Sequence, residues 1–245
     1  MTESAAGSRY TGAYYDAIAE GSARSASVIV PIVAPLVGAM SVVDVGCGTG
    51  AWLAEFARHG AGRILGIDGD YVDRSRLEIP ADRFVSADLA GDWRVRERFD
   101  LAVCLEVAEH VAPAASAKLV DGLVGLAPVV MFSAAIPYQG GEGHVNERWP
   151  TFWYELFRER GYELVDPVRK RVWSDRRVEP WYQQNMVLYA SRAALAGNAA
   201  LRSEHEQTFP GFLSVVHPRL YGPVLERAGV KPPGPWEPQG GRAHL

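Results

Sequence analysis

The sequence predicts an α/β protein built on one doubly wound, mostly parallel sheet. Apolar segments of strand length alternate with segments of helical periodicity, and several of the early strands end in an acidic residue. The carboxyl ends of parallel strands share one edge, where open α/β sheets bind ligands. We therefore expect the functional site at that edge. The expected strands begin near residues 42, 64, 84, 99, 129, 162 and 185.

The first strand runs into a loop with three alternating glycines, Gly46, Gly48 and Gly50. Glycine allows a positive φ and lets a ligand approach the backbone closely. Residues 51–59 then show helical spacing and stop at Gly60. Strand, glycine loop and helix predict a nucleotide-type site. The same spacing also satisfies the dinucleotide fingerprint, so the loop alone leaves the cofactor open.

Two further acids narrow the choice of cofactor. Asp68 ends the second strand, where a carboxylate can accept hydrogen bonds from both ribose hydroxyls, as it also could in a dehydrogenase. Asp88 ends the third expected strand. A third acid at this position suits an adenine amino group better than anything that a nicotinamide cofactor requires.

With these motifs, residues 40–192 resemble the class I S-adenosylmethionine (SAM)-dependent methyltransferases that act on small molecules. The resemblance implies a Rossmann-like methyltransferase fold of seven strands, the last antiparallel, with an N-terminal helical cap. It implies S-adenosyl-L-methionine as cofactor and S-adenosyl-L-homocysteine (SAH) as product. The residues expected to bind the cofactor are Asp44, Gly46, Cys47, Gly48, Gly50, Asp68, Gly69, Asp88, Leu89, Leu105 and Tyr14.

Three segments are expected along the chain: a helical cap over 1–37, the SAM-binding methyltransferase core over 38–192, and a helical extension with a Pro-rich tail over 193–245. The cap is expected to be helical from about Ala23, and the extension over 193–206 and 215–227. Tyrosines of the cap could cover the cofactor or acceptor, or could simply hold the helix to the core.

The acceptor is expected to meet the loop 136–149, which follows the fifth strand. His144 is the first choice for a catalytic base, because a neutral imidazole can take the proton of an attacking hydroxyl. Glu109 and His110 form a second candidate pair after the fourth strand. His144 could instead cap the next helix or anchor the loop, and Glu109 and His110 could instead cap a helix or form an exposed pair. The predicted acceptor contacts are Tyr15, Tyr138, Glu179, Trp181 and Tyr182, of which the last three could instead latch the sheet edge. No metal site is predicted.

Composition limits the partners. The 25 basic and 29 acidic residues give a net charge of −4, and the sequence has no dense Lys/Arg stripe of the kind that binds nucleic acid. Nucleic acid is therefore not expected as a partner.

The longest apolar stretch, 28–40, is interrupted by two prolines, so no membrane span is expected. The only cysteines, Cys47 and Cys104, are expected to be reduced thiols in a cytoplasmic protein. Oligomeric state is left open.

The predicted function is methyl transfer from SAM to a small-molecule acceptor, most simply an oxygen nucleophile. A small-amine N-methyltransferase, an NAD(P)-dependent reductase and a non-catalytic SAM-binding protein are the alternatives.

Overall fold

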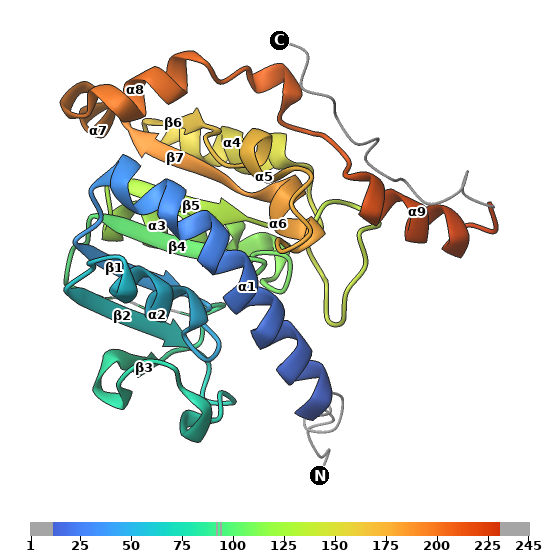
Figure 1. The fold of residues 1–245 in the computed structure, drawn as a ribbon, viewed down its shortest axis with the longest axis horizontal. Coiled ribbons are helices and arrows are strands. Elements are labelled where there is room, and N and C mark those ends of the chain that lie inside the picture. Colours follow the sequence, from blue (N-terminus) through green and yellow to red (C-terminus); the bar gives the residue numbers. More distant parts are fainter. Residues whose placement is uncertain (1–11, 92, 94, 231–245) are drawn as a thin grey trace.

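A computed structural model describes residues 12–91, 93 and 95–230, with side chains from residue 19 onward. Its centre is a seven-stranded sheet of order β3-β2-β1-β4-β5-β7-β6 (Figure 1). The predicted α/β class and strand number are confirmed. The strands are β1 Ser41–Val45, β2 Arg63–Asp68, β3 Phe84–Ser86, β4 Leu101–Leu105, β5 Val129–Ser133, β6 Tyr162–Val165 and β7 Val187–Ser191.

The strands β1 to β5 are parallel, and β7 runs antiparallel between β5 and β6. Val42 pairs with Ile64 on one side and with Leu101 on the other, so β1 lies at the centre of the parallel part. The order reverses between β1 and β4, and ligand sites of open α/β sheets form at such a switch point. The loops after β1 and β4 are therefore the first place to look for a site.

Helices cover both faces of the sheet (Figure 1). One hydrophobic core contains residues of α1 and α2, and a second contains residues of α3 and α4. The helices are α1 Gly12–Val37, α2 Ala51–Arg58, α3 Ser116–Leu126, α4 Pro150–Glu159, α5 Arg169–Val172, α6 Pro180–Asn185, α7 Arg192–Gly197, α8 Ala199–Glu206 and α9 Pro218–Arg227. Short 3₁₀ turns lie at Arg74–Arg76, Ala81–Arg83, Pro113–Ala115 and Pro210–Phe212.

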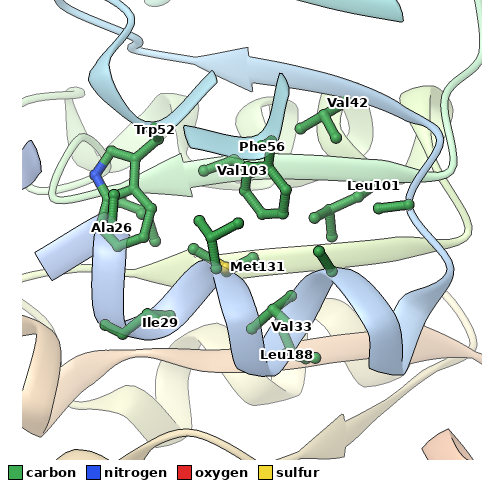
Figure 2. Close-up of a cluster of buried hydrophobic side chains, with 14 of the residues drawn as sticks. Ala26, Ile29, Val33, Val42, Trp52, Phe56, Leu101, Val103, Met131 and Leu188 are labelled. Carbon is green, nitrogen blue, oxygen red and sulfur yellow. The ribbon is translucent and has the colours of Figure 1, made fainter. Parts of the chain in front are cut away.

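The long helix α1 lies across the sheet beside α2, and its N-terminal half projects past the carboxyl ends of the parallel strands (Figure 1). Its fully buried side chains, Ile29 and Val33 among them, come four residues apart and pack toward Met131 of β5 and Leu188 of β7 (Figure 2). An i, i+4 spacing places side chains on one helix face. The C-terminal half of α1 is thus held by core packing, which positions the projecting half.

Three boundaries differ from those expected. Helix α1 is already helical at Gly12, well before Ala23. The helix expected over 193–206 is two helices, because Asn198 leaves helical geometry (φ −127°, ψ 105°) and its side chain accepts a hydrogen bond from the Leu201 N–H at 3.0 Å. Strand β3 ends at Ser86, so Asp88 lies in the loop that follows.

Two sequence predictions fall outside what the structure describes. Tyr14 and Tyr15 lie in the first turn of α1, but their side chains are not described. The Pro-rich tail begins beyond residue 230 and lies outside the described residues. Of the helices that are described, none combines the length and apolar character needed to cross a membrane.

Candidate cofactor and acceptor site

The glycine loop after β1 presses against the turn after β4. The Gly46 N–H donates to the carbonyl of Ile67 at 2.7 Å, and Gly46 has φ +83°. A Cβ added to Gly46 would lie 2.2 Å from a methyl carbon of Val107. Position 46 therefore favours glycine for two reasons: its φ is positive, and a side chain there would clash with Val107. The loop and the β4 turn consequently share one surface at the switch point.

Asp68 ties the glycine loop to the end of β2. Its carboxylate accepts hydrogen bonds from the Gly48 N–H and the Gly69 N–H, each at 2.7 Å, and from the Tyr71 hydroxyl at 2.5 Å. The residue is only 4% exposed. The structure thus brings Gly46, Gly48, Asp68 and Gly69 together as the sequence predicted, whereas nothing in the sequence pointed to Tyr71.

Asp44 is buried at the end of β1. Its burial, and then the neighbouring Asp68, raise its pKa well above the usual value. A cationic group bound here would restore the charged form of this carboxyl. Cys47 and Cys104 are free and buried, and burial raises the pKa of both thiols, so neither is a nucleophile.

Asp88 is exposed, and its side chain accepts a hydrogen bond from the Ala90 N–H at 3.0 Å. It borders a cavity of about 390 Å³ beside the end of β3. The role of Asp88 and Leu89 in binding adenine stays a prediction. The lining residues of the cavity are Ile67, Val85, Ser86, Ala87, Asp88, Gly91, Trp93 and Val95.

The three predicted catalytic residues converge at the same edge. One possible ligand atom from each of Glu109, His110 and His144 lies within 4.8 Å of the others. The two imidazole rings meet edge to face, with centroids 4.9 Å apart. Glu109 is fully buried, and its carboxylate makes no well-aligned hydrogen bond among the described residues, although the Glu106 carboxyl and the Ala135 backbone lie beside it. Its burial, and then the nearby Glu106, raise its pKa.

Backbone hydrogen bonds bring His144 to this cluster from the loop after β5. The Glu109 carbonyl accepts from the N–H groups of Val145 and Asn146, at 2.9 and 3.0 Å. The buried Asn146 amide donates to the Ala108 carbonyl at 3.3 Å and to the Ser116 hydroxyl at 2.9 Å. Residues 144–146 are therefore fastened to the turn that carries Glu109 and His110.

Glu147 sets the orientation of His144. Nδ1 of His144 lies 2.9 Å from the Glu147 carboxylate, which also accepts from the backbone N–H groups of Tyr138 and Gly140. A carboxylate accepts, so Nδ1 carries the proton, and in the neutral ring the lone pair is then on Nε2. A Cβ at Gly141 would lie 2.2 Å from Nε2, so only glycine leaves room beside this nitrogen.

Glu106 is a site residue whose side chain the sequence analysis did not name. It has φ +53°, which is unusual for a residue other than glycine, and backbone outliers of this kind cluster at functional sites. Its carboxylate accepts from the amides of Gln139 and Asn185, both at 3.1 Å. Its burial raises its pKa. The sequence signal that could have revealed it is a second acid three residues before Glu109.

The predicted acceptor contacts on α6 hold this helix to α1. Glu179 pairs with Arg24 at 2.6 Å, and the Tyr182 hydroxyl lies 3.0 Å from the Ser22 hydroxyl. Burial raises the pKa of Tyr182 to about 12. Trp181 is partly buried beside it, whereas Tyr138 is exposed. Glu179 and Tyr182 thus connect α6 to α1, which agrees with the alternative role in closing the sheet edge. That Glu179, Trp181 or Tyr182 contacts an acceptor stays a prediction.

The sheet order, the glycine loop and the Asp68 cradle at the switch point define a class I SAM-dependent methyltransferase. A family model described as a methyltransferase domain matches residues 19–167, more than half of the chain. The chain belongs to this methyltransferase family, and SAM is its cofactor.

Curated relatives match only part of their length. The chain is 34% identical over 82 residues to the ubiquinone biosynthesis O-methyltransferase of Bradyrhizobium diazoefficiens, covering 30% of this chain and 31% of that protein. It is 36% identical over 91 residues to the enzyme of the same name from Methylobacterium, covering 34% of each. The chain thus matches about a third of the length of these relatives.

Solved structures share the fold at low identity. A sugar N-methyltransferase from Streptoalloteichus has a TM-score of 0.58 at 17% identity, over 78% of this chain and 98% of that one. The magnesium protoporphyrin IX methyltransferase of Synechocystis with bound SAH has a TM-score of 0.54 at 17% identity, over 75% and 88%. These likenesses establish the architecture alone.

Proposed function

We propose that this protein transfers the methyl group of SAM to an oxygen atom of a small-molecule acceptor. The observation that carries the proposal is the contact between Gly46 and Val107. It places the loop of the cofactor cradle directly against the turn that carries Glu109 and His110. Methyl donor and acceptor groups would therefore lie side by side at one sheet edge.

The residues of the cradle fit SAM. Asp68 offers a buried carboxylate at the place of a ribose, and Asp44 is a buried acid whose charged form an ammonium group would favour. Gly46 and Gly50 both have positive φ, and an added Cβ would meet Val107 at 2.2 Å and Ile79 at 3.0 Å, which supports a loop whose backbone N–H groups meet the cofactor. When bound, SAM supplies an activated methyl on a positive sulfur, and the protein's task is mainly alignment.

The acceptor side favours an oxygen nucleophile. An alcohol must lose a proton to attack, and His144 lies in a group of acid and imidazole side chains suited to handle that proton. Both curated relatives described above are named O-methyltransferases. Family membership also favours methyl transfer over hydride transfer by a reductase.

The test has two steps. SAH should bind the purified chain in calorimetry, and Asp68→Ala should abolish that binding, because the carboxylate holds both the loop and the ribose. The protein should then move radiolabelled methyl from SAM to members of a panel of phenols, alcohols and amines, with the product bond assigned by NMR. Absence of SAH binding, or label found only on nitrogen, would refute the proposal.

We further propose a cytoplasmic protein that does not bind nucleic acid. The two free, buried thiols support the first statement and the net charge of −4 supports the second. Cell fractionation tests the location, and a gel shift with RNA and DNA at low salt tests the binding.

A further inference from the structure

Glu109 is the feature of this site that methyl transfer alone does not explain. Its carboxylate is fully buried, makes no well-aligned hydrogen bond among the described residues and lies beside the Glu106 carboxyl and the Ala135 backbone, and a ring nitrogen of each of two histidines lies within 4.8 Å of it. Two buried carboxyl groups side by side without a cation are costly, so a positive partner is implied. We propose that Glu109, His110 and His144 bind a divalent ion of the first transition row.

The donor set has the chemistry of such an ion. Two imidazoles and one carboxylate form a known ligand set for zinc and for non-haem iron, and imidazole ligands favour these metals over magnesium. Bonds of about 2.1 Å place neighbouring ligand atoms about 3.4 Å apart in a tetrahedral site. One ligand atom of each residue already lies within 4.8 Å of the others, so small shifts of these side chains bring the atoms to that spacing.

A hydrogen bond to one nitrogen of each imidazole leaves the other nitrogen for a metal. Glu147 accepts the Nδ1 proton of His144 and leaves Nε2 for the metal. His110 has a hydrogen bond to the Gly143 backbone, which occupies one ring nitrogen. Ligating histidines in metal sites regularly use their second nitrogen in these two ways. Gly141 keeps the space beside Nε2 of His144 open.

With three protein ligands, the ion keeps open positions for an acceptor oxygen; this part rests on the proposed function. A hydroxyl bound there has a lowered pKa and releases its proton to water. The oxygen then forms a bond to the methyl carbon of SAM while the carbon–sulfur bond breaks, and the electron pair goes to sulfur to give SAH. The ion thus supplies the acceptor site with positive charge beside two glutamates, the buried Glu109 and the partly buried Glu106.

Metal binding is tested without turnover. The full chain is stripped with a chelator and titrated with Co²⁺, Zn²⁺ and Mg²⁺ in separate calorimetric runs, and Co²⁺ binding is also followed by its visible absorption. We expect one Co²⁺ or Zn²⁺ per chain, and Mg²⁺ binding at least about tenfold weaker, because imidazole suits the transition ions. Equal or better binding of Mg²⁺ would overturn the assigned class of ion.

Variants locate the site. Glu109→Gln, His110→Ala and His144→Ala should each weaken Co²⁺ binding by more than about 100-fold, and Glu147→Gln by about 10- to 100-fold, as expected for an outer partner of a ligand. His59→Gln is the matched control, because His59 pairs with Glu55 at the end of α2. SAH binding by each variant serves as the check of folding.

Each result is decisive. The exposed His110 can be replaced without disturbing the core, so His110→Ala tests the site even if Glu109→Gln fails to fold. A chain that binds SAH but no Co²⁺ or Zn²⁺, or variants that bind Co²⁺ like the wild type, would overturn the metal site and leave the proposed methyl transfer standing. A chain that binds metal but not SAH would overturn the proposed function and leave the metal site standing.

Discussion

The hydroxyl of Tyr71 lies 2.5 Å from the carboxylate of Asp68. Asp68 accepts two backbone N–H groups as well, from Gly48 and Gly69, so Tyr71 occupies acceptor capacity that a ribose would use. With both ribose hydroxyls donating to Asp68, as proposed, binding of SAM would displace this hydroxyl. Because an ordinary hydrogen bond contributes about 0.5–1.5 kcal/mol net, its displacement lowers the cofactor affinity.

Tyr71→Phe should accordingly tighten SAH binding by about twofold to tenfold, measured by calorimetry. Tyr221→Phe on α9, also exposed, is the matched control and should leave the affinity unchanged. A weaker affinity of Tyr71→Phe would mean that the hydroxyl contacts the cofactor instead of competing with it.

Gly46→Ala should destabilise the protein and abolish SAH binding. The new Cβ combines φ +83° with a 2.2 Å approach to a methyl carbon of Val107. Backbone strain alone costs about 1–3 kcal/mol. Gly38→Ala measures the backbone strain alone, because Gly38 has φ +71° and no atom within 4 Å of the added Cβ. In urea denaturation, Gly46→Ala should lose more free energy of unfolding than Gly38→Ala.

The double variant Gly46→Ala/Val107→Ala measures how much of the lost free energy of unfolding comes from the clash with Val107. Removing both Val107 methyl carbons leaves its Cβ 3.2 Å from the new side chain, so part of the stability should return. If the two substitutions add without any recovery, the contact between the glycine loop and the β4 turn does not matter energetically.

Asn146→Ala should lower kcat more than it lowers SAH affinity. The buried amide holds residues 144–146 to the turn after β4, and its loss leaves the Ala108 carbonyl and Ser116 without this donor, at about 1–3 kcal/mol. Asn198→Ala removes a helix cap far from the site and should lower stability while leaving kcat unchanged. Equal kcat values for the two variants would contradict a positioning role for Asn146.

His217 should make the stability fall in mild acid. Its Nδ1 accepts the Arg219 N–H, and its Nε2 donates to the Trp173 carbonyl, so the folded protein holds the neutral ring. Burial lowers its pKa, with the nearby Arg219 acting in the same direction. The unfolded chain therefore binds this proton more readily, and the free energy of unfolding should decrease as the pH falls below about 6.5.

His217→Asn checks this pH dependence. An asparagine can still accept the Arg219 N–H as the cap of α9 but does not titrate. Urea midpoints measured at pH 7.5 and pH 5.5 should then differ less than in the wild type. An unchanged difference would place the acid sensitivity in other groups.

Local patterns were sufficient for most of the fold. Strand β5 begins at Val129 and β6 at Tyr162, as the apolar pattern predicted, because burial of a strand is reflected directly in the order of its apolar residues. The boundaries that differed depended on other causes. Asn198 divides a helix through one side-chain cap, and the extent of β3 depends on its pairing with β2.

The cofactor half of the site could also be read from the sequence, since each of its residues lies next to a strand end. The acceptor half could not be read in the same way. Glu109 and His144 are separated by α3 and β5, and they are brought together by the backbone bonds from Val145 and Asn146 to the Glu109 carbonyl and by the Asn146 amide bond to Ala108. Backbone hydrogen bonds between distant segments leave no pattern in the residues that make them.

By itself, the sequence determined the class of fold, the edge that carries the site and the nucleotide that the glycine loop and its acids would hold. Only the tertiary structure decided that the Tyr71 hydroxyl bonds to Asp68, that Glu106 enters the site with a positive φ, and that Glu109 is buried beside two imidazoles. The physical reason is that strand order follows from local apolar patterns, whereas burial and pairing of a polar group depend on segments far apart along the chain.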